Sequence, residues 1–252
     1  MVLIIGHRGA RGEKPENTLE AFRHAARLGI PIETDIAMTA DLVPVMHHDP
    51  TLPDGRLIRD LPFAALPNIP SLAQSLTALP EQIWLLEIKT YPPTPEKSHP
   101  PALLVARVLQ TLHDAKTNLA NIALKAFDWE VLRETARQSK TLRRIALTAP
   151  ETEAAREIWW GRGLSTATTP EAVAGTGAKT WSAFQGTLTA AAIAEAHSLG
   201  LQVLAWTVNS QADFQRLAPL VDGIVTDYPT RMLYPEFNAA TAGQPRDQTE
   251  TD

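Results

Sequence analysis

Short apolar segments alternate with segments of helical periodicity along most of this chain of 252 residues. Apolar runs of about four to eight residues are typical of buried strands, whereas apolar positions about three and four apart are typical of helices. Strands are predicted at residues 3–6, 30–36, 43–47, 83–88, 122–126, 143–147, 179–183, 202–207 and 223–226. The clearest helices are predicted at residues 18–28, 102–112, 129–138, 151–160, 190–199 and 211–217.

The short spacing between the second and third predicted strands decides the topology. Residues 37–42 alone separate them, whereas a parallel neighbour needs a crossover of about a dozen residues or more. The two strands should therefore form an antiparallel hairpin that turns at residues 39–42. Of the nine strands, eight then remain parallel, and with their helices they predict a (β/α)8 TIM barrel.

A single barrel domain is predicted over residues 1–237, with a small insertion near the mouth of the barrel. The stretch 49–70 is expected to form this insertion or lid because it contains several large apolar residues. These are Leu57, Ile58, Leu61, Phe63 and Leu66. Residues 238–252 have no apolar periodicity and are expected to be a disordered tail.

The first predicted helix has recognisable signals at both ends. Asn17 precedes it and Glu20 follows three residues later, which is the pattern of a capping box. Gly29 stands where a left-handed residue commonly ends a helix. A capping role explains Asn17 without any chemical function.

Composition narrows the class of function. A formal net charge of −5 and a pI of about 5.8 argue against nucleic-acid binding, which needs a basic face. An anionic small molecule is still compatible, because a metal ion and a few local cations can hold one. The absence of cysteine excludes disulfides and a thiolate nucleophile, and it is consistent with a cytoplasmic location. No signal peptide and no apolar run of membrane-spanning length is recognised, so stable membrane insertion is not expected.

Two carboxylates occupy one face of the second predicted strand. Because strand side chains alternate between faces, Glu33 and Asp35 point together while Thr34 points away. Neighbouring carboxylates repel each other unless a cation lies between them or one carries a proton. The active site of such a barrel lies at the carboxyl ends of the strands, so the pair predicts a divalent-metal site there.

Histidine and arginine side chains accompany these carboxylates. His7 and Arg8 end the first predicted strand, and an arginine fork suits either phosphate oxygens or an ion pair with the neighbouring carboxylates. On the returning arm of the hairpin, His47 and His48 point to opposite faces, so only one easily faces the mouth. We expect His48 to lie across from one of the two carboxylates, with the register left open.

Glu87 and Lys89 share one face of an otherwise apolar strand. A carboxylate is costly to bury there unless it is paired or bound to a cation. Either the two residues form a simple ion pair, or Glu87 is a third metal ligand and Lys89 contacts a phosphate. Oxygen ligands of this kind favour Mg²⁺ or Ca²⁺. Among the aromatic residues near strand ends, Trp206 is the candidate substrate contact, with a core position as the simpler interpretation.

Seven segments together make the chain resemble the glycerophosphodiester phosphodiesterase family. They are His7-Arg8-Gly9, Pro15-Glu16-Asn17-Thr18 with Ala21-Phe22, Glu33-Thr34-Asp35, Pro44-Val45-Met46-His47-His48-Asp49 with Thr51-Leu52, Glu87-Ile88-Lys89, Trp206-Thr207-Val208-Asn209 and Val221-Asp222-Gly223-Ile224-Val225-Thr226-Asp227. Each segment alone is a weak signal, but all of them occur in the family's order.

This resemblance implies a barrel hydrolase of lipid and glycerol metabolism, which cleaves glycerophosphodiesters to sn-glycerol 3-phosphate and an alcohol. The implied roles are metal ligation by Glu33, Asp35 and Glu87, acid–base catalysis by His7 and His48, and phosphate contact by Arg8 and Lys89. The resemblance thus selects His48 over His47, and it implies a divalent metal, Mg²⁺ or Ca²⁺. It leaves open which imidazole is the acid, the preferred alcohol and the oligomeric state.

Two departures from the family pattern bear on substrate preference. Residues 52–56 read Leu-Pro-Asp-Gly-Arg where the family usually has an arginine-threonine-threonine stretch. Residues 125–127 read Lys-Ala-Phe where a serine often precedes the phenylalanine. Separately from these departures, two alternatives to the implied reaction stay open: a lysophospholipase D-like phosphodiesterase on the same barrel, and a non-catalytic phosphoester-binding module.

Overall fold

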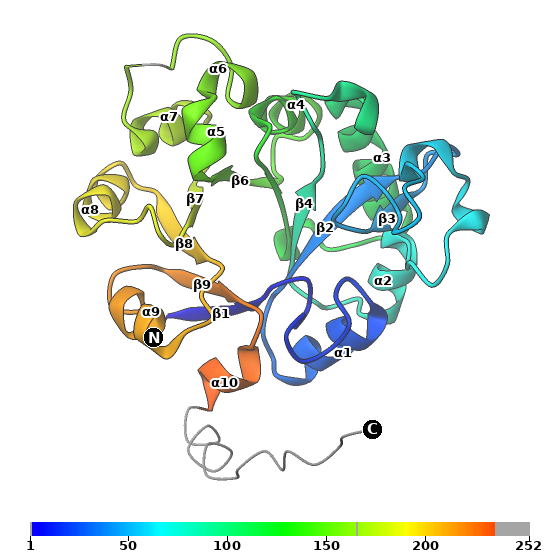
Figure 1. Ribbon diagram of the computed structural model, residues 1–252, viewed down its shortest axis with the longest axis horizontal. Coiled ribbons are helices and arrows are strands. Elements are labelled where there is room, and N and C mark those ends of the chain that lie inside the picture. Colours follow the sequence, from blue (N-terminus) through cyan, green and yellow to red (C-terminus); the bar gives the residue numbers. More distant parts are fainter. Residues whose placement is uncertain (1, 165, 235–252) are drawn as a thin grey trace, which may run out of the picture.

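The computed structural model describes residues 2–164 and 166–234, which form a ring of strands surrounded by helices (Figure 1). The strands are β1 (Leu3–Gly6), β2 (Ile32–Met38), β3 (Pro44–Met46), β4 (Trp84–Ile88), β5 (Ile122–Ala126), β6 (Arg143–Thr148), β7 (Thr180–Phe184), β8 (Gln202–Trp206) and β9 (Gly223–Thr226). The α-helices are α1 (Leu19–Arg27), α2 (Leu72–Ala78), α3 (Pro101–Asp114), α4 (Trp129–Gln138), α5 (Pro150–Ala154), α6 (Arg156–Trp159), α7 (Thr169–Gly175), α8 (Ala190–Ser198), α9 (Gln211–Leu217) and α10 (Pro229–Leu233). The shorter 3₁₀ helices are η1 (Ile58–Asp60), η2 (Phe63–Ala65), η3 (Pro95–Lys97) and η4 (Leu119–Asn121). The tail expected at residues 238–252 lies outside the described residues.

Strand pairing confirms the predicted TIM barrel. Neighbouring strands follow the order β1-β9-β8-β7-β6-β5-β4-β2, and β1 pairs with β2 to close the ring. β3 lies outside the ring and runs antiparallel to β2, with Ile36 opposite Met46 and Ala37 opposite Val45. The predicted hairpin is therefore present, and the pairings within the ring itself are parallel.

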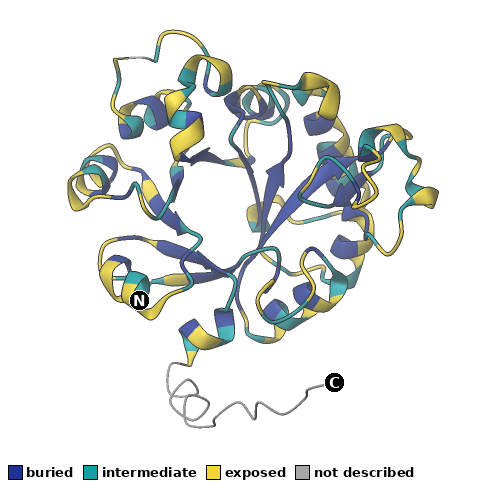
Figure 2. Ribbon diagram, in the orientation of Figure 1, coloured by how far each residue is buried: buried dark blue, intermediate teal, exposed yellow. Residues whose placement is uncertain are grey.

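Helices cover the outer face of the ring, so the strands are buried on both faces (Figure 2). The predicted helix at residues 151–160 is divided into α5 and α6, because Ala155 between them leaves helical dihedral angles. The helices α2, α7 and α10 lie outside the ranges predicted as clearest. Among the described residues, no helix is both long and apolar enough to cross a bilayer.

Buried apolar side chains form separate clusters outside and inside the ring. In the outer cluster, Phe22 of α1 meets Trp84 of β4 edge to face, with ring centroids 5.2 Å apart. The inner cluster is small and comprises Ile5, Leu85, Ala123, Ile145, Leu204 and Val225. The polar and charged side chains at the carboxyl ends of the strands lie above this inner cluster and rest on it.

The insertion after β3 packs beside the hairpin. Leu52 and Ile58 join Ala37 and Val45 in an apolar cluster of their own. None of the described residues 49–70 lines the pocket at the barrel mouth. The insertion therefore supports the hairpin next to the mouth and does not cover it.

The start of α1 differs from the prediction. Thr18 is the N-cap, and its Oγ1 accepts a hydrogen bond from the backbone N–H of Ala21 at 3.2 Å. Asn17 adopts a left-handed φ of 55°, which asparagine tolerates better than most residues, and its side chain reaches β2. The capping role predicted for Asn17 was therefore wrong. Gly29 follows the helix with a φ of 71°, as predicted.

Candidate active site

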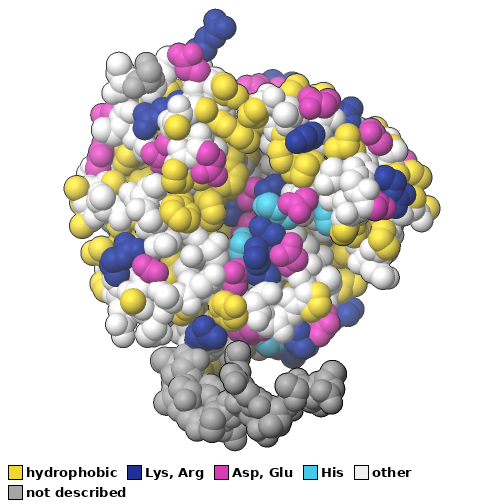
Figure 3. Space-filling model, in the orientation of Figure 1, with side chains coloured by type: hydrophobic (Ala, Val, Ile, Leu, Met, Phe, Trp, Pro, Cys, Tyr) yellow, Lys and Arg dark blue, Asp and Glu magenta, His cyan; other side chains and the backbone are white. Residues whose placement is uncertain are grey.

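A pocket of about 240 Å³ opens at the carboxyl ends of the barrel strands. In the view down the barrel, acidic, basic and histidine side chains gather at its centre (Figure 3). Its lining consists of His7, Arg8, Arg11, Glu33, Asp35, His48, Glu87, Lys125, Phe127, Leu147, Trp206, Thr207 and Val225. All the site residues predicted from the sequence are in this lining except Lys89, which lies just outside it.

The three predicted carboxylates converge from two adjacent strands. Glu33 and Asp35 share the inner face of β2, and the register with β4 places Asp35 beside Glu87. Each residue offers one oxygen atom, and these atoms lie within 4.8 Å of one another. Glu33 and Asp35 are 1% exposed and Glu87 is 6% exposed. Three acidic side chains are thus buried around one point.

Two buried lysines offset this negative charge. Lys125 on β5 places its Nζ 2.9 Å from Glu33 Oε1 and 3.9 Å from Glu87 Oε2. Lys89 follows β4 and places its Nζ 2.7 Å from Glu87 Oε1 and 3.5 Å from Asp35 Oδ1. The two ammonium groups therefore hold the carboxylates in place from two sides.

These charges determine the ionisation of the site. Burial opposes the charged form of Asp35, but Lys89, His48 and Arg8 outweigh it and hold the pKa of Asp35 well below its usual value. Burial likewise opposes ionisation of Glu33, and Lys125 above all keeps its pKa below the usual range. The pKa of Lys89 is raised, because Glu87 and Asp35 outweigh its own desolvation. Glu33, Asp35 and Lys89 are therefore all charged at neutral pH.

The donor set fits a divalent cation. Mg²⁺ and Ca²⁺ take carboxylate oxygens at distances of about 2.0–2.6 Å, and three buried carboxylates present such oxygens from one side. The opposite side faces the pocket, where a substrate oxygen could complete the coordination. A bound ion would share the carboxylates with Lys89 and Lys125.

His7 is held by an aspartate from the other end of the chain. Its Nδ1 donates a hydrogen bond to Asp227 Oδ1 at 2.6 Å, and its Nε2 lies 3.9 Å from Glu33 Oε2. Asn209 fixes Asp227 by donating from Nδ2 to Oδ2 at 2.7 Å and accepting from the Asp227 backbone at 2.9 Å. Burial raises the pKa of Asp227, but the contacts with His7 and Asn209 lower it by more, so the carboxylate is charged.

The side chains of His47 and His48, which follow β3, point in different directions. His47 stands opposite Asp35, donating its backbone N–H to the Asp35 carbonyl at 3.1 Å, and its ring turns to the carbonyl of Thr51. His48 faces the pocket, and its Nδ1 donates to Asp49 Oδ1 at 2.7 Å. His48 was expected to lie across from Glu33 or Asp35, and this was wrong, because His47 takes the position opposite Asp35, strand pairing ends at Met46 and the chain then bends. The bend, not the pairing, brings His48 to the mouth.

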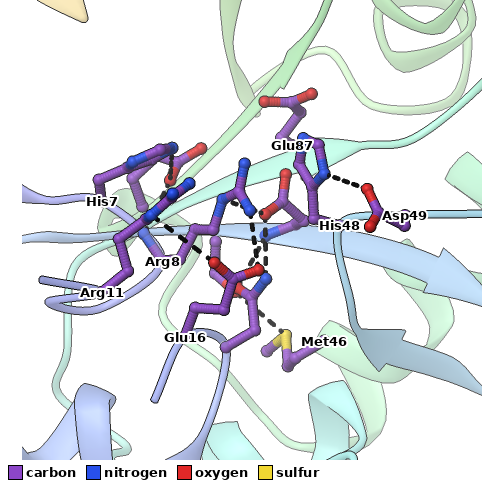
Figure 4. Close-up of polar contacts among 12 residues, drawn as sticks. His7, Arg8, Arg11, Glu16, Met46, His48, Asp49 and Glu87 are labelled. Carbon is purple, nitrogen blue, oxygen red and sulfur yellow. Dashed lines mark hydrogen bonds and ion pairs between the residues drawn. The ribbon is translucent and has the colours of Figure 1, made fainter. Parts of the chain in front are cut away.

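Two arginines complete the charged rim (Figure 4). Arg8 adopts a φ of 50°, which turns its guanidinium to Glu16 Oε1 at 2.8 Å and Asp35 Oδ2 at 3.3 Å. The Arg8 atom nearest Asp35 is Nε, which is buried and is paired with Asp35 by charge without forming a hydrogen bond. Arg11 lies 3.6 Å from Asp227 Oδ1. In the view of Figure 4, His7 and His48 lie on opposite sides of Arg8.

The wall facing these charges is aromatic. Trp206 lies edge to face with Phe127 and Phe184, at centroid distances of 5.5 and 5.7 Å. Trp159 of α6 extends the wall beyond Phe127. Trp181 is buried away from the pocket and donates its ring N–H to Thr148. The pocket thus has a charged side and an apolar side.

Comparison with known proteins decides the family. The sequence profile of the glycerophosphoryl diester phosphodiesterase family matches residues 7–231. The chain belongs to this family.

Solved structures and curated sequences agree with the family assignment. A structure from Silicibacter pomeroyi DSS-3, described as a glycerophosphoryl diester phosphodiesterase, is 32% identical with a TM-score of 0.83, covering 95% of this chain and 94% of that one. An Oleispira antarctica phosphodiesterase in complex with sn-glycerol-3-phosphate is 20% identical with a TM-score of 0.77, covering 93% and 96%. YhdW of Bacillus subtilis is 27% identical over 90% of this chain and 94% of its own length. The match to glycerophosphodiester phosphodiesterase 1 of Bos taurus, 48% over 52 residues, spans 20% of this chain and 16% of that relative.

Four residues of the candidate site escaped the sequence analysis. Asn17 donates from Nδ2 to Asp35 Oδ2 at 3.0 Å, but its neighbourhood looked like a helix cap. Lys125 is an inward-facing cation in an apolar strand, the same signal that identified Glu87. Asp227 stands in one of the segments that resemble the family, but the sequence analysis assigned it no role, and Arg11 carried no signal beyond its place after β1.

Proposed function

We propose that this protein hydrolyses glycerophosphodiesters to sn-glycerol 3-phosphate and an alcohol, using Mg²⁺ or Ca²⁺ bound by Glu33, Asp35 and Glu87. The observation that carries the proposal is the convergence of these carboxylates with two imidazoles in one pocket. Family membership supports the reaction class. The sn-glycerol-3-phosphate bound to the Oleispira antarctica protein supports a substrate of this size.

The charged side of the pocket binds the phosphate. When bound, a divalent ion supplies Lewis-acid polarisation of a phosphoryl oxygen. Arg8 and Arg11 both line the pocket, and their guanidinium charges face a nonbridging phosphate oxygen. Lys89, placed behind Glu87 and Asp35, orients these carboxylates and does not touch the phosphate. Trp206 packs against the glycerol or alcohol portion of the substrate.

The histidines move the protons. His7 commits its Nδ1–H to Asp227, which leaves Nε2 facing the pocket to take or give a proton. His48 is oriented in the same way by Asp49. One imidazole removes a proton from the nucleophile, either water or the glycerol hydroxyl of the substrate, and the other protonates the leaving alkoxide as its P–O bond breaks. Each role is worth about 10²–10⁴-fold in rate.

Hydrolysis of glycerophosphocholine, with Mg²⁺, with Ca²⁺ and with chelator, tests the proposal. Glu87→Gln should weaken metal binding measured by calorimetry and lower the rate, while Glu130→Gln, a matched change on the exposed face of α4, should alter neither. Full activity of the wild type in chelator would refute metal dependence. Metal affinity unchanged by Glu87→Gln would remove that residue from the ligand set.

A second candidate activity is the cleavage of lysophospholipids at the same phosphodiester bond. The aromatic wall of Phe127, Trp159 and Trp206 favours it, because such a wall could hold an acyl chain. Comparing kcat/KM for glycerophosphocholine and for a long-chain lysophosphatidylcholine separates the two activities. Stoichiometric binding of both compounds without turnover, in the presence of metal, would indicate a binding module instead.

A further inference from the structure

A second cavity opens at the opposite, amino-terminal end of the barrel. It has a volume of about 420 Å³, within the range of roughly 300–1,000 Å³ that is usual for small-molecule sites. Bulky side chains normally fill the interior of such a barrel in layers. Here the inward-facing residue that β5 contributes is the small Ala123, and the cavity extends up to the inner apolar cluster.

The walls of this cavity are apolar and its mouth is open. Ile5, Leu85, Ala123, Ile145 and Leu204 line its depth, and all of them are buried. At the mouth, Leu3 is 47% exposed and Ile83 is 41% exposed. Large apolar side chains exposed at the entrance of an apolar cavity are suited to contact a hydrocarbon chain.

The charged residues around the mouth of this cavity are all basic. Lys140, Arg143, Arg144 and Lys179 line the cavity, and its lining contains no acidic residue. Within residues 2–164 and 166–234, none of these four cations has an ion-pair partner. The guanidinium of Arg143 instead donates to the carbonyl of Ala120 at 2.8 Å.

Arg144 shows the same lack of a counter-charge. Its Nη1 donates to the carbonyl of Thr176 at 2.8 Å and its Nη2 to that of Gly177 at 3.0 Å. Burial lowers its pKa, and no carboxylate offsets this effect. The chain has a net charge of −5, so its overall composition does not explain four cations without acidic partners at one opening. This local excess of positive charge marks a site for an anion.

We propose that this cavity binds a single-chain carboxylate amphiphile, a medium-chain fatty acid, with its chain among the apolar walls and its carboxylate at the basic mouth. One chain fits a cavity of this volume, whereas a polyanion such as a nucleotide would bury charge against Ile5 and Leu85. The site lies at the other end of the barrel from the candidate active site, so it does not depend on the function proposed above.

Calorimetric titration of the full chain with hexanoate, octanoate and decanoate below their micellar concentrations tests the proposal. One molecule should bind per chain, with affinity rising about fourfold per added methylene until the cavity is filled. Neutral 1-decanol should bind about tenfold or more weakly than decanoate, because it lacks the charge-assisted hydrogen bonds to the mouth.

Two variants probe the two halves of the site. Ala123→Leu fills the cavity from its wall, and Arg143→Glu with Lys179→Glu reverses charge at its mouth, so each should weaken decanoate binding about tenfold or more. Ala190→Leu on exposed α8 and Arg162→Glu on an exposed turn are the matched controls, and both should bind as the wild type does. Circular dichroism and thermal unfolding check that each variant folds.

Three outcomes would overturn the proposal. The first is no saturable binding of decanoate to the wild type. The second is binding that neither the filling variant nor the charge reversal weakens, since the ligand would then lie elsewhere. The third is 1-decanol binding as tightly as decanoate, which would refute the anionic class. Association with vesicles of anionic phospholipid, without binding of monomeric decanoate, would likewise replace the site by a lipid-surface contact.

Discussion

The contact between His7 and Asp227 allows a quantitative test of the proposed proton transfer. In the wild type, His7 Nδ1 and Asn209 Nδ2 both donate to the Asp227 carboxylate, at 2.6 and 2.7 Å. In Asp227→Asn, a single amide group must face both of these donors. If the new carbonyl accepts from Asn209, the new NH₂ faces His7 and forces its proton onto Nε2. The nitrogen that faces the pocket is then blocked as a base.

Two losses set the size of the effect: the charge-assisted hydrogen bond between His7 and Asp227, and the correct tautomer of His7. A charge-assisted hydrogen bond is worth about 1.5–3 kcal/mol, which corresponds to roughly 10–150-fold in rate at about 1.4 kcal/mol per tenfold. The wrong tautomer adds to this, and in serine proteases the equivalent change costs about 10⁴-fold. We therefore expect kcat for glycerophosphocholine to fall by about 10²–10⁴-fold.

Steady-state kinetics and metal calorimetry together check this expectation. Metal affinity should stay close to the wild-type value, because Asp227 contacts none of Glu33, Asp35 and Glu87. Asp222→Asn is the matched control, since Asp222 forms a histidine pair of the same kind, with His197 at 3.1 Å, at the far end of β9. An Asp227→Asn protein with nearly full kcat would refute the role of His7. A parallel loss of metal affinity would show that Asp227 acts through the metal site.

Three further perturbations test the charge balance of the site. Lys125→Met removes the cation beside Glu33, so it should tighten Mg²⁺ binding by about tenfold or more in calorimetry and lower the melting temperature in chelator, since breaking a buried ion pair costs about 3–5 kcal/mol. Asn17→Ala should cost about 1–3 kcal/mol in urea unfolding, because it removes one buried hydrogen bond from Asp35 and one from Thr34; a loss no larger than that of Thr18→Ala, about 1 kcal/mol, would contradict this. Because the folded pKa of Asp35 is lowered, its contribution to stability is complete above the unfolded pKa of ~4 and is lost as pH falls through the folded pKa. Acid unfolding followed by circular dichroism should therefore be less steep in Asp35→Asn, and an identical curve would count against this ion pairing.

The barrel and its carboxylates were predictable because both follow from short-range periodicity. The separation of two apolar segments by residues 37–42 was enough to require a hairpin, and the pairing of β2 with β3 bears this out. Glu33 and Asp35 share a face for the same reason that any residues two apart in a strand do. Glu87 was found because a carboxylate in an apolar strand needs a partner.

Residues that depend on backbone turns could not be found in this way. Asn17 and Arg8 reach the site through positive φ angles of 55° and 50°, which no periodicity reveals. His48 reaches it through a bend after Met46, where strand alternation no longer applies. Asp227 meets His7 across 220 residues of sequence, and only closure of the ring brings the two together.

Because β9 closes the ring against β1, the contact between His7 and Asp227 can form only late in protein synthesis. Of the described strands, β1 is made first and β9 last, yet most of the pairing of β1 is with β9, and a single residue pair joins it to β2. A nascent chain on the ribosome therefore carries its first strand without its main neighbour until almost all the described residues have emerged. Any fragment that stops short of β9 lacks the carboxylate that holds His7, so shortened translation products should be catalytically silent even if their other strands assemble.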